Sequence, residues 1–216
     1  MTDPPALLAV AHGSREPEAA RATTALVEAL QHRLPTVSVR VAYLDFGSPS
    51  FPEARASLPE AVIVPLLLSR GTHSRRDLPP EAAPTLGPDP RLTEVLLDRV
   101  SEAGIAPETP LVLAAAGTLD PEGRDDVREQ AQLLHAAWGA PVVAGFVTAA
   151  VPTVRQARTQ VEAEHGRVAV VSYFLAPGRL PTASRAVTAP LGDHPQLVEL
   201  AADRYRTRAA AGAARR

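Results

Sequence analysis

The chain has 216 residues, of which 45% are hydrophobic and 21% are charged, as is usual for a globular protein. Its 22 basic and 24 acidic side chains leave a net charge of −2, which argues against a nucleic-acid or membrane-surface footprint. Cysteine and lysine are both absent, so disulfides, iron–sulfur clusters, Schiff-base lysines and Walker lysines are excluded.

Short apolar segments alternate with amphipathic ones along the first half of the chain. The predicted elements are, in order, a strand at Ala6–Ala11, a helix at Pro17–Leu34, a strand at Val37–Leu44, a helix that begins at Pro49-Ser50, and a strand at Ala61–Leu68. The last of these strands is apolar almost throughout, which is typical of a parallel strand covered on both faces. The alternation predicts an α/β fold with a mostly parallel sheet.

The second half of the chain repeats the first. Four segments pair in the same order at offsets of 103 to 107 residues, for example AVIVPLLLSRGTH at 61–73 with VAVVSYFLAPGRL at 168–180. We interpret this as a tandem duplication, with one unit at 1–106 and a degenerate second unit at 107–216. The low-complexity tail at 209–216 is expected to fray.

Three polar residues follow the predicted strands of the first unit. His12 ends the first strand, Asp45 ends the second, and His73 lies in the loop after the third. Because ligands of open α/β sheets bind at the carboxyl ends of parallel strands, we expect these side chains to meet there. Two imidazoles and a carboxylate suit a divalent transition metal such as Fe, Co, Ni or Zn. Gly13 and Gly71 would allow sharp turns beside them.

The second unit provides an internal control for these three residues. At the matching positions it carries Ala116, Thr148 and Leu180. The apolar strand pattern remains, so packing does not require the histidines or the carboxylate. Their joint loss favours a functional role and confines the predicted active site to the first unit. For Asp45 a second interpretation stays open, since a carboxylate before Gly-Ser-Pro could cap the following helix.

Other polar side chains flank the two histidines on the predicted loops. They are Ser14, Arg15, Arg70, Ser74, Arg75 and Arg76. A single surface arginine is usually just solvated, but four of them would form a positive rim suited to a substrate with several carboxylates. Asp77 could orient His73, hold one of the arginines, or cap a short turn.

At these residues the chain resembles the class II chelatases of tetrapyrrole biosynthesis, the sirohydrochlorin cobalto- and ferrochelatases. The resemblance rests on Ala11-His12-Gly13-Ser14, on Tyr43-Leu44-Asp45 before Pro49-Ser50, on the run from Pro65 through Gly71-Thr72-His73 to Asp77-Leu78-Pro79, and on Leu86-Gly87. The second unit resembles the inactive half of the family's long, fused form, so the likeness covers almost the whole chain.

The resemblance implies two tandem Rossmann-type α/β/α units related by a pseudo-two-fold, and hence a monomer with a built-in pseudo-dimer. It carries the family's metal-binding histidines onto His12 and His73, and its acidic metal-site residue, commonly a glutamate, onto Asp45. The implied reaction is the insertion of Co²⁺ or Fe²⁺, with Ni²⁺ as a third candidate, into sirohydrochlorin. The metal is a substrate, and no nucleotide is required.

Three other functions stay open. A histidine phosphatase also places His-Gly after its first strand, but normally has Arg before the histidine, where this chain has Ala11. A serine hydrolase using Ser14, His73 and Asp77 would lack the Gly-x-Ser-x-Gly elbow of that class. A non-catalytic carrier of the metal or the tetrapyrrole would use the same ligands as the enzyme.

The N-terminal segment has an acidic residue and two prolines where a secretory signal needs basic charge. No apolar run approaches the roughly 20 residues that span a bilayer. We therefore expect a cytoplasmic protein whose partner is a small tetrapyrrole rather than a membrane or a nucleic acid.

Overall fold

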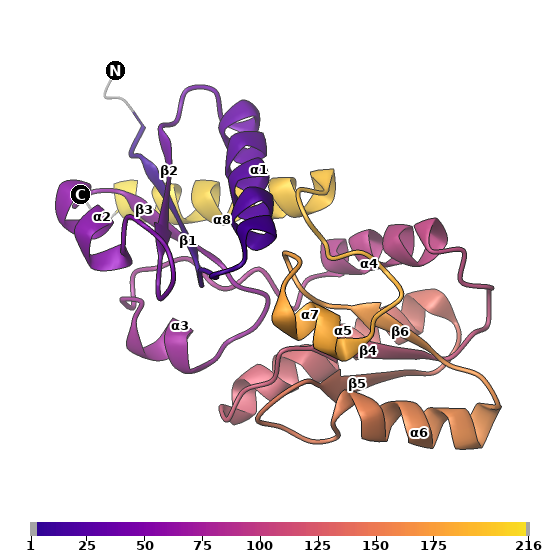
Figure 1. Ribbon diagram of the computed structural model, residues 1–216. Helices are drawn as coiled ribbons and strands as arrows, with labels where there is room; N and C mark the ends of the chain where they lie inside the picture. Colours follow the sequence, from indigo (N-terminus) through magenta and orange to yellow (C-terminus); the bar gives the residue numbers. More distant parts are fainter. Residues whose placement is uncertain (1–3, 215–216) are drawn as a thin grey trace.

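The computed structural model describes residues 4–214, apart from the side chain of His73, and is drawn in Figure 1. The first unit contains β1 (Leu7–Ala11), α1 (Pro17–Arg33), β2 (Val39–Tyr43), α2 (Phe51–Ser57), β3 (Val62–Leu66), α3 (Thr72–Arg76) and α4 (Pro90–Glu102). The second contains β4 (Leu111–Ala115), α5 (Pro121–Trp138), β5 (Val142–Phe146), α6 (Val154–His165), β6 (Ala169–Ser172), α7 (Arg179–Ser184) and α8 (Pro195–Ala213).

Each unit has its own three-stranded parallel sheet. The strand order is β2-β1-β3 in the first unit and β5-β4-β6 in the second, so the first strand of each unit lies in the middle. In the first sheet Leu7 pairs with Val39 on one side and with Val62 on the other. The predicted α/β fold with parallel sheets is confirmed, and the equal strand order agrees with a duplication.

The central strands are buried on both faces, as their continuous apolar sequences predict. In β1, Leu7 and Ala9 face the large core that both units share, whereas Leu8 and Val10 face a smaller core under α2. This alternation follows from the two-residue period of a strand. In β4, Leu111 and Leu113 belong to the shared core and Val112 and Ala114 to a smaller core under α6.

The two units exchange their closing helices. Helix α4 packs on α5 and β6 of the second unit, and α8 packs on α1 and β3 of the first. Figure 1 shows α8 crossing behind the first sheet although it is the last element of the chain. The units of the sequence are therefore not separate globules, because each sheet is covered on its inner face by a helix from the other half.

The end of the chain differs from the expected frayed tail, since α8 continues to Ala213 and so includes most of the segment 209–216. Residues 215–216 lie outside the described residues. Among the residues that the structure describes, none of the helices combines the length and the apolar character needed to cross a bilayer.

Candidate active site

His12 and Asp45 lie together at the carboxyl edge of the first sheet. His12 follows β1 directly, and Asp45 comes two residues after the end of β2. Because β1 and β2 are parallel neighbours, the loops that leave them start at the same edge. The backbone N–H of Asp45 donates to the carbonyl of His12 at 3.0 Å, which continues the strand pairing into the loop.

The two side chains face each other at a distance suited to a shared cation. Nε2 of His12 lies 3.5 Å from Oδ2 of Asp45, and the side chains are 47% and 40% exposed. Nδ1 of His12 lies 3.2 Å from the carbonyl oxygen of Gly13, so Nε2 is the ring nitrogen that faces Asp45. Two ligand atoms about 2.1 Å from one metal at a tetrahedral angle are about 3.4 Å apart. The pair can therefore contribute two ligands to one ion.

Gly13 allows the loop after β1 to pass close to the loop after β2, a contact that we call the loop crossing. Its φ is +92°, and a Cβ atom there would lie 2.1 Å from the carbonyl oxygen of Phe46. The backbone N–H of Ser14 donates to that same oxygen at 3.0 Å. The predicted sharp turn beside His12 is confirmed, and it needs glycine both for its left-handed backbone and for the close approach.

The second unit repeats this crossing without the ligands. The N–H of Thr148 donates to the carbonyl of Ala116 at 2.9 Å, as that of Asp45 does to His12. Gly117 has a φ of +94°, and its Cβ would lie 1.9 Å from the carbonyl oxygen of Thr148. The backbone thus forms without an imidazole or a carboxylate, which argues against a structural requirement for His12 and Asp45.

The capping interpretation of Asp45 is wrong. Helix α2 begins after Ser50, whose N–H and hydroxyl both donate to the carboxylate of Glu53, at 2.9 and 2.7 Å. These hydrogen bonds lower the pKa of Glu53. The helix therefore has a complete capping box of its own, and Asp45 is not its cap.

His73 lies in α3, the short helix that follows β3, at the same edge of the sheet. Its side chain falls outside the described part of the structure. Among the side chains that the structure describes, which do not include that of His73, no three histidines or carboxylates are grouped so that they could hold a metal ion. The three-ligand site of His12, Asp45 and His73 stays a prediction.

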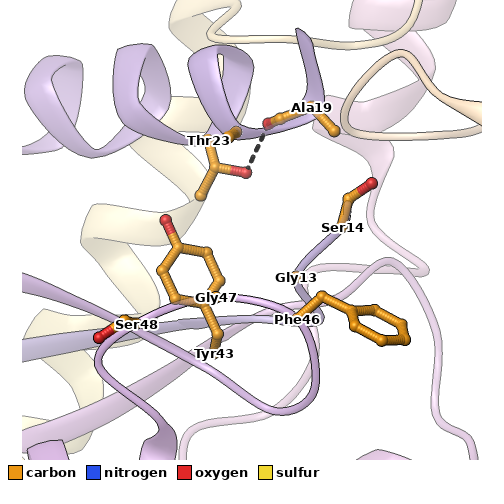
Figure 2. Close-up of a pocket in the computed structure, with 9 residues that line it drawn as sticks. Gly13, Ser14, Ala19, Thr23, Tyr43, Phe46, Gly47 and Ser48 are labelled. Atoms are coloured by element: carbon orange, nitrogen blue, oxygen red, sulfur yellow. Dashed lines mark hydrogen bonds between the residues drawn. The ribbon is translucent and has the colours of Figure 1, made fainter. Parts of the chain in front are cut away.

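The guanidinium of Arg15 lies over the ring of Phe46, a residue that was not predicted to belong to the site. The guanidinium carbon lies 4.5 Å from the ring centre of Phe46, which is 42% exposed. Figure 2 shows the Phe46 ring pointing away from Tyr43, whose own ring points toward Thr23 of α1. A cation above an exposed aromatic face, one residue beyond Asp45, forms a flat amphipathic surface beside the candidate site.

The cavity drawn in Figure 2 is not large enough to be the substrate site. It has a volume of about 240 Å³ and is lined by Gly13, Ser14, Ala19, Ala20, Thr23, Tyr43, Phe46, Gly47 and Ser48. Pockets for ligands of drug size have volumes of about 300–1,000 Å³. A macrocycle of tetrapyrrole size therefore does not fit inside this cavity.

Arg70 and Arg75 contact the second unit. Arg70 binds Asp126 and Glu122 of α5, and Arg75 binds Asp120 and Glu122. The hydrogen bonds that the guanidinium of Arg70 donates to Asp126 raise the pKa of Arg70 above its usual value. The predicted role of these arginines in binding substrate carboxylates stays a prediction, but both already have carboxylate partners within the protein.

The two serines of the predicted rim make local contacts. Ser14 Oγ accepts from the N–H of Glu16 at 3.1 Å, and Thr118 makes the matching contact with Asp120 in the second unit, also at 3.1 Å. The hydroxyl of Ser74 donates to the carbonyl of Gly71 at 2.9 Å. Because the second unit keeps the contact of Ser14, this serine has a local structural role, and its predicted role in binding substrate stays a prediction. Arg76 and Asp77 are exposed at the end of α3.

Comparisons with known proteins identify the family of this chain. A family model described as CbiX matches residues 6–103 and again residues 110–208, once in each unit. The chain belongs to the CbiX family. This membership confirms the resemblance to class II chelatases and explains the repeat, since each unit corresponds to one copy of the CbiX fold.

Three relatives illustrate the range of the CbiX family. A sirohydrochlorin ferrochelatase from Priestia megaterium is 27% identical in an alignment of length 198 that covers 81% of this chain and 74% of the relative. A sirohydrochlorin cobaltochelatase from Methanopyrus kandleri is 26% identical in an alignment of length 137 that covers 45% of this chain and 96% of the relative. The structure of SirB from Bacillus subtilis with Fe³⁺ covers 98% of both chains with a TM-score of 0.82 at 23% identity, which shows a shared two-unit fold.

Proposed function

We propose that this CbiX-family chain inserts Co²⁺ or Fe²⁺ into sirohydrochlorin without a nucleotide. The observation that carries the proposal is the His12–Asp45 pair, 3.5 Å apart and open to solvent at the carboxyl edge of the first sheet. The same backbone in the second unit has Ala116 and Thr148 instead. Membership of the family and the activities named for its relatives support the choice of metal and macrocycle.

The reaction exchanges one divalent ion for two pyrrole N–H protons, so total charge is conserved. The neutral imidazole of His12 can bind the ion through Nε2 and leave other coordination positions open for the pyrrole nitrogens. The carboxylate of Asp45 reduces the cost of bringing the cation into a partly dry site. As the ion moves to the macrocycle, both groups regain basic lone pairs and can accept the released protons.

Exposed apolar side chains near the strand ends suit the flat body of the macrocycle. Large exposed hydrophobic residues of the described chain include Phe46, Leu119, Val151 and Leu180, and each of these follows the carboxyl end of a strand. Clusters of exposed apolar side chains commonly mark binding surfaces. We propose that the macrocycle lies between the two sets of loops, with Arg15 near one of its carboxylate side chains.

The test is an insertion assay with purified protein, sirohydrochlorin and Co²⁺, Fe²⁺ or Ni²⁺, in which the absorption spectrum of the macrocycle reports the metal. We expect insertion without ATP and a loss of about 100-fold in rate for His12→Ala. His32→Ala is the matched control, since His32 is exposed on α1 and contacts only the carbonyl of Glu28 in its described hydrogen bond.

Three results would contradict the proposal. Full activity of His12→Ala would show that His12 does not belong to the active site. Tight binding of the macrocycle with no change in its spectrum on adding any metal would favour a carrier. Release of phosphate from a simple phosphomonoester would favour a phosphatase. Comparison of the rates with Co²⁺ and Fe²⁺ decides which metal the protein prefers, because the ligand types alone do not.

A further inference from the structure

The segment that carries His73 is bound at several points by the second unit. It runs from Leu68, just after β3, to Arg76 at the end of α3. Near its start, the hydroxyl of Tyr173 donates to the carbonyl of Leu68 at 3.1 Å. Burial raises the pKa of Tyr173, so this hydroxyl stays protonated and remains a donor. Tyr173 follows β6, so the contact crosses between the units.

Asp126 of α5 makes the central contact with this segment. Its side chain is only 2% exposed, and its carboxylate accepts the backbone N–H of Arg70 at 2.8 Å and the guanidinium Nε of Arg70 at 3.0 Å. A buried carboxylate needs this kind of complete hydrogen bonding, because it is very costly to bury a charge without partners. Asp126 therefore fixes both the backbone and the side chain of Arg70.

The far end of the segment is bound by the first turn of α5. Arg75 of α3 pairs with Asp120 at 2.6 Å and also with Glu122, which in turn pairs with Arg70. His73 lies between these two arginines in the sequence. The backbone N–H of Arg70 before His73 and the side chain of Arg75 after it are thus both bound to carboxylates of the second unit.

A glycine in α5 allows the segment to come this close. A Cβ atom on Gly123 would lie 2.0 Å from the carbonyl oxygen of Arg70. Because this obstacle is a backbone atom, a side chain at 123 would displace the segment itself. The segment also adjoins the loop after β4, because a Cβ atom on Gly71 would be 3.4 Å from the hydroxyl oxygen of Thr118.

Among the residues that the structure describes, comparison of the two units shows that these contacts are made only around the segment that contains His73, and not around the matching segment that contains Leu180. When the two units are matched as above, Asp126 corresponds to Ala22, Arg70 to Pro177 and Gly123 to Ala19. The reciprocal pair, Ala22 and Pro177, has no charge and cannot form the same hydrogen bonds. The segment with His73 is therefore bound by an ion pair whose carboxylate, that of Asp126, is buried, whereas the matching segment with Leu180 has no such pair.

We infer that Asp126 is a positioning residue, which acts through Arg70 to hold the His73 segment where its histidine can join His12 and Asp45 in binding the metal. The inference rests on the proposed function, in which His73 is a metal ligand. It assigns the second unit a part in the geometry of the metal site, although that unit has none of the three ligands.

Asp126→Asn tests this, with Asp125→Asn as the matched control. Asp125 is the neighbouring carboxylate on α5, but its side chain is 67% exposed and pairs with Arg128 of its own helix. We expect Asp126→Asn to bind Co²⁺ about tenfold or more weakly, by spectroscopic titration of the protein alone. Hydrogen exchange of the amides at 69–76 should become faster. Asp125→Asn should change neither quantity.

Two further variants separate positioning from a general loss of stability. Gly123→Ala should weaken Co²⁺ binding like Asp126→Asn, whereas Gly212→Ala in α8, where a Cβ meets nothing within 4 Å, should not. Val161→Ala creates a cavity in the small core under α6 and should lower the unfolding temperature without changing Co²⁺ affinity.

The outcomes distinguish this inference from the proposed function. Unchanged exchange at 69–76 in Asp126→Asn overturns the inference, whatever the enzyme does. Faster exchange with unchanged Co²⁺ affinity overturns it as well, since Asp126 would then have a structural role only. If the wild type binds Co²⁺ but inserts no metal into sirohydrochlorin, the proposed function fails, while Co²⁺ affinity and exchange still decide the role of Asp126.

Discussion

The loops at the carboxyl ends of the strands cross in the same way in both units, but only one crossing carries the proposed metal ligands. In the first unit the crossing is made by His12 and Asp45, and in the second by Ala116 and Thr148, with the same backbone hydrogen bond. Gly13 and Gly117 have nearly the same φ, +92° and +94°. The fold therefore does not depend on the side chains that are proposed to bind the metal. A protein with a single unit would not allow this comparison.

The second unit differs from the first in what it adds as well as in what it lacks. It has Asp126 and Gly123 on α5, where α1 of the first unit has Ala22 and Ala19. The added groups contact the first unit through Arg70. The second unit thus lacks the proposed metal ligands but has contacts that support the first unit. Such a difference is expected when two copies in one chain diverge toward different tasks.

The largest effect is expected from adding a methyl group at the two crossings. Gly13→Ala and Gly117→Ala should each lower the free energy of unfolding by about 2–4 kcal/mol, because each combines left-handed backbone strain with a backbone clash. Denaturant unfolding measures this. At a temperature where both variants are folded, only Gly13→Ala should weaken Co²⁺ binding, because the second crossing has neither an imidazole nor a carboxylate. Equal loss of Co²⁺ affinity in both variants would mean that the metal site is not confined to the first unit.

An intermediate effect is expected from exchanging the side chains of the two units. Asp45→Thr gives the first unit the residue of the second and should lower the insertion rate by about 10–100-fold, with a higher KM for the metal. The mirror variant, Thr148→Asp, should leave both unchanged, because Ala116 offers no imidazole beside it. An unaltered KM for the metal in Asp45→Thr would show that the carboxylate does not contact the ion.

The smallest effect concerns the exchanged helix α8. Glu199 of α8 binds Arg33 of α1, and this hydrogen bond, together with one from Arg206, lowers the pKa of Glu199 below its ordinary value of 4.5. The stabilisation is therefore present above that value and is lost as the pH falls through the lower pKa of the folded state. Glu199→Gln should lower the free energy of unfolding by at most about 1 kcal/mol at neutral pH, since the pair is partly exposed.

The control for that experiment is Glu164→Gln, an exposed position on α6 whose described partners, Gln160 and His165, are on the same helix. Denaturant unfolding of both variants at neutral pH and well below pH 4.5 measures the difference. A stability loss in Glu199→Gln that is the same at both pH values would contradict the role of its charge in joining α8 to the first unit.

Much of the molecule was predicted from local patterns. The helix expected at Pro17–Leu34 is observed at Pro17–Arg33, and the strand expected at Val37–Leu44 is observed at Val39–Tyr43. The side chains of His12 and Asp45 meet as expected, because parallel neighbouring strands bring the residues after them to one edge. Phe46 was missed, although an aromatic residue directly after Asp45 in a polar loop was a visible signal.

The sequence by itself determined the repeat, the parallel sheets and the edge at which the ligands lie, since these follow from hydrophobic periodicity and from the order of the strands. Only the tertiary structure decided that α4 and α8 are exchanged between the units and that Asp126 binds Arg70. Both are contacts between residues far apart in the chain. No local pattern distinguishes a helix that covers its own sheet from one that covers its neighbour's, because the amphipathic face is the same in either case.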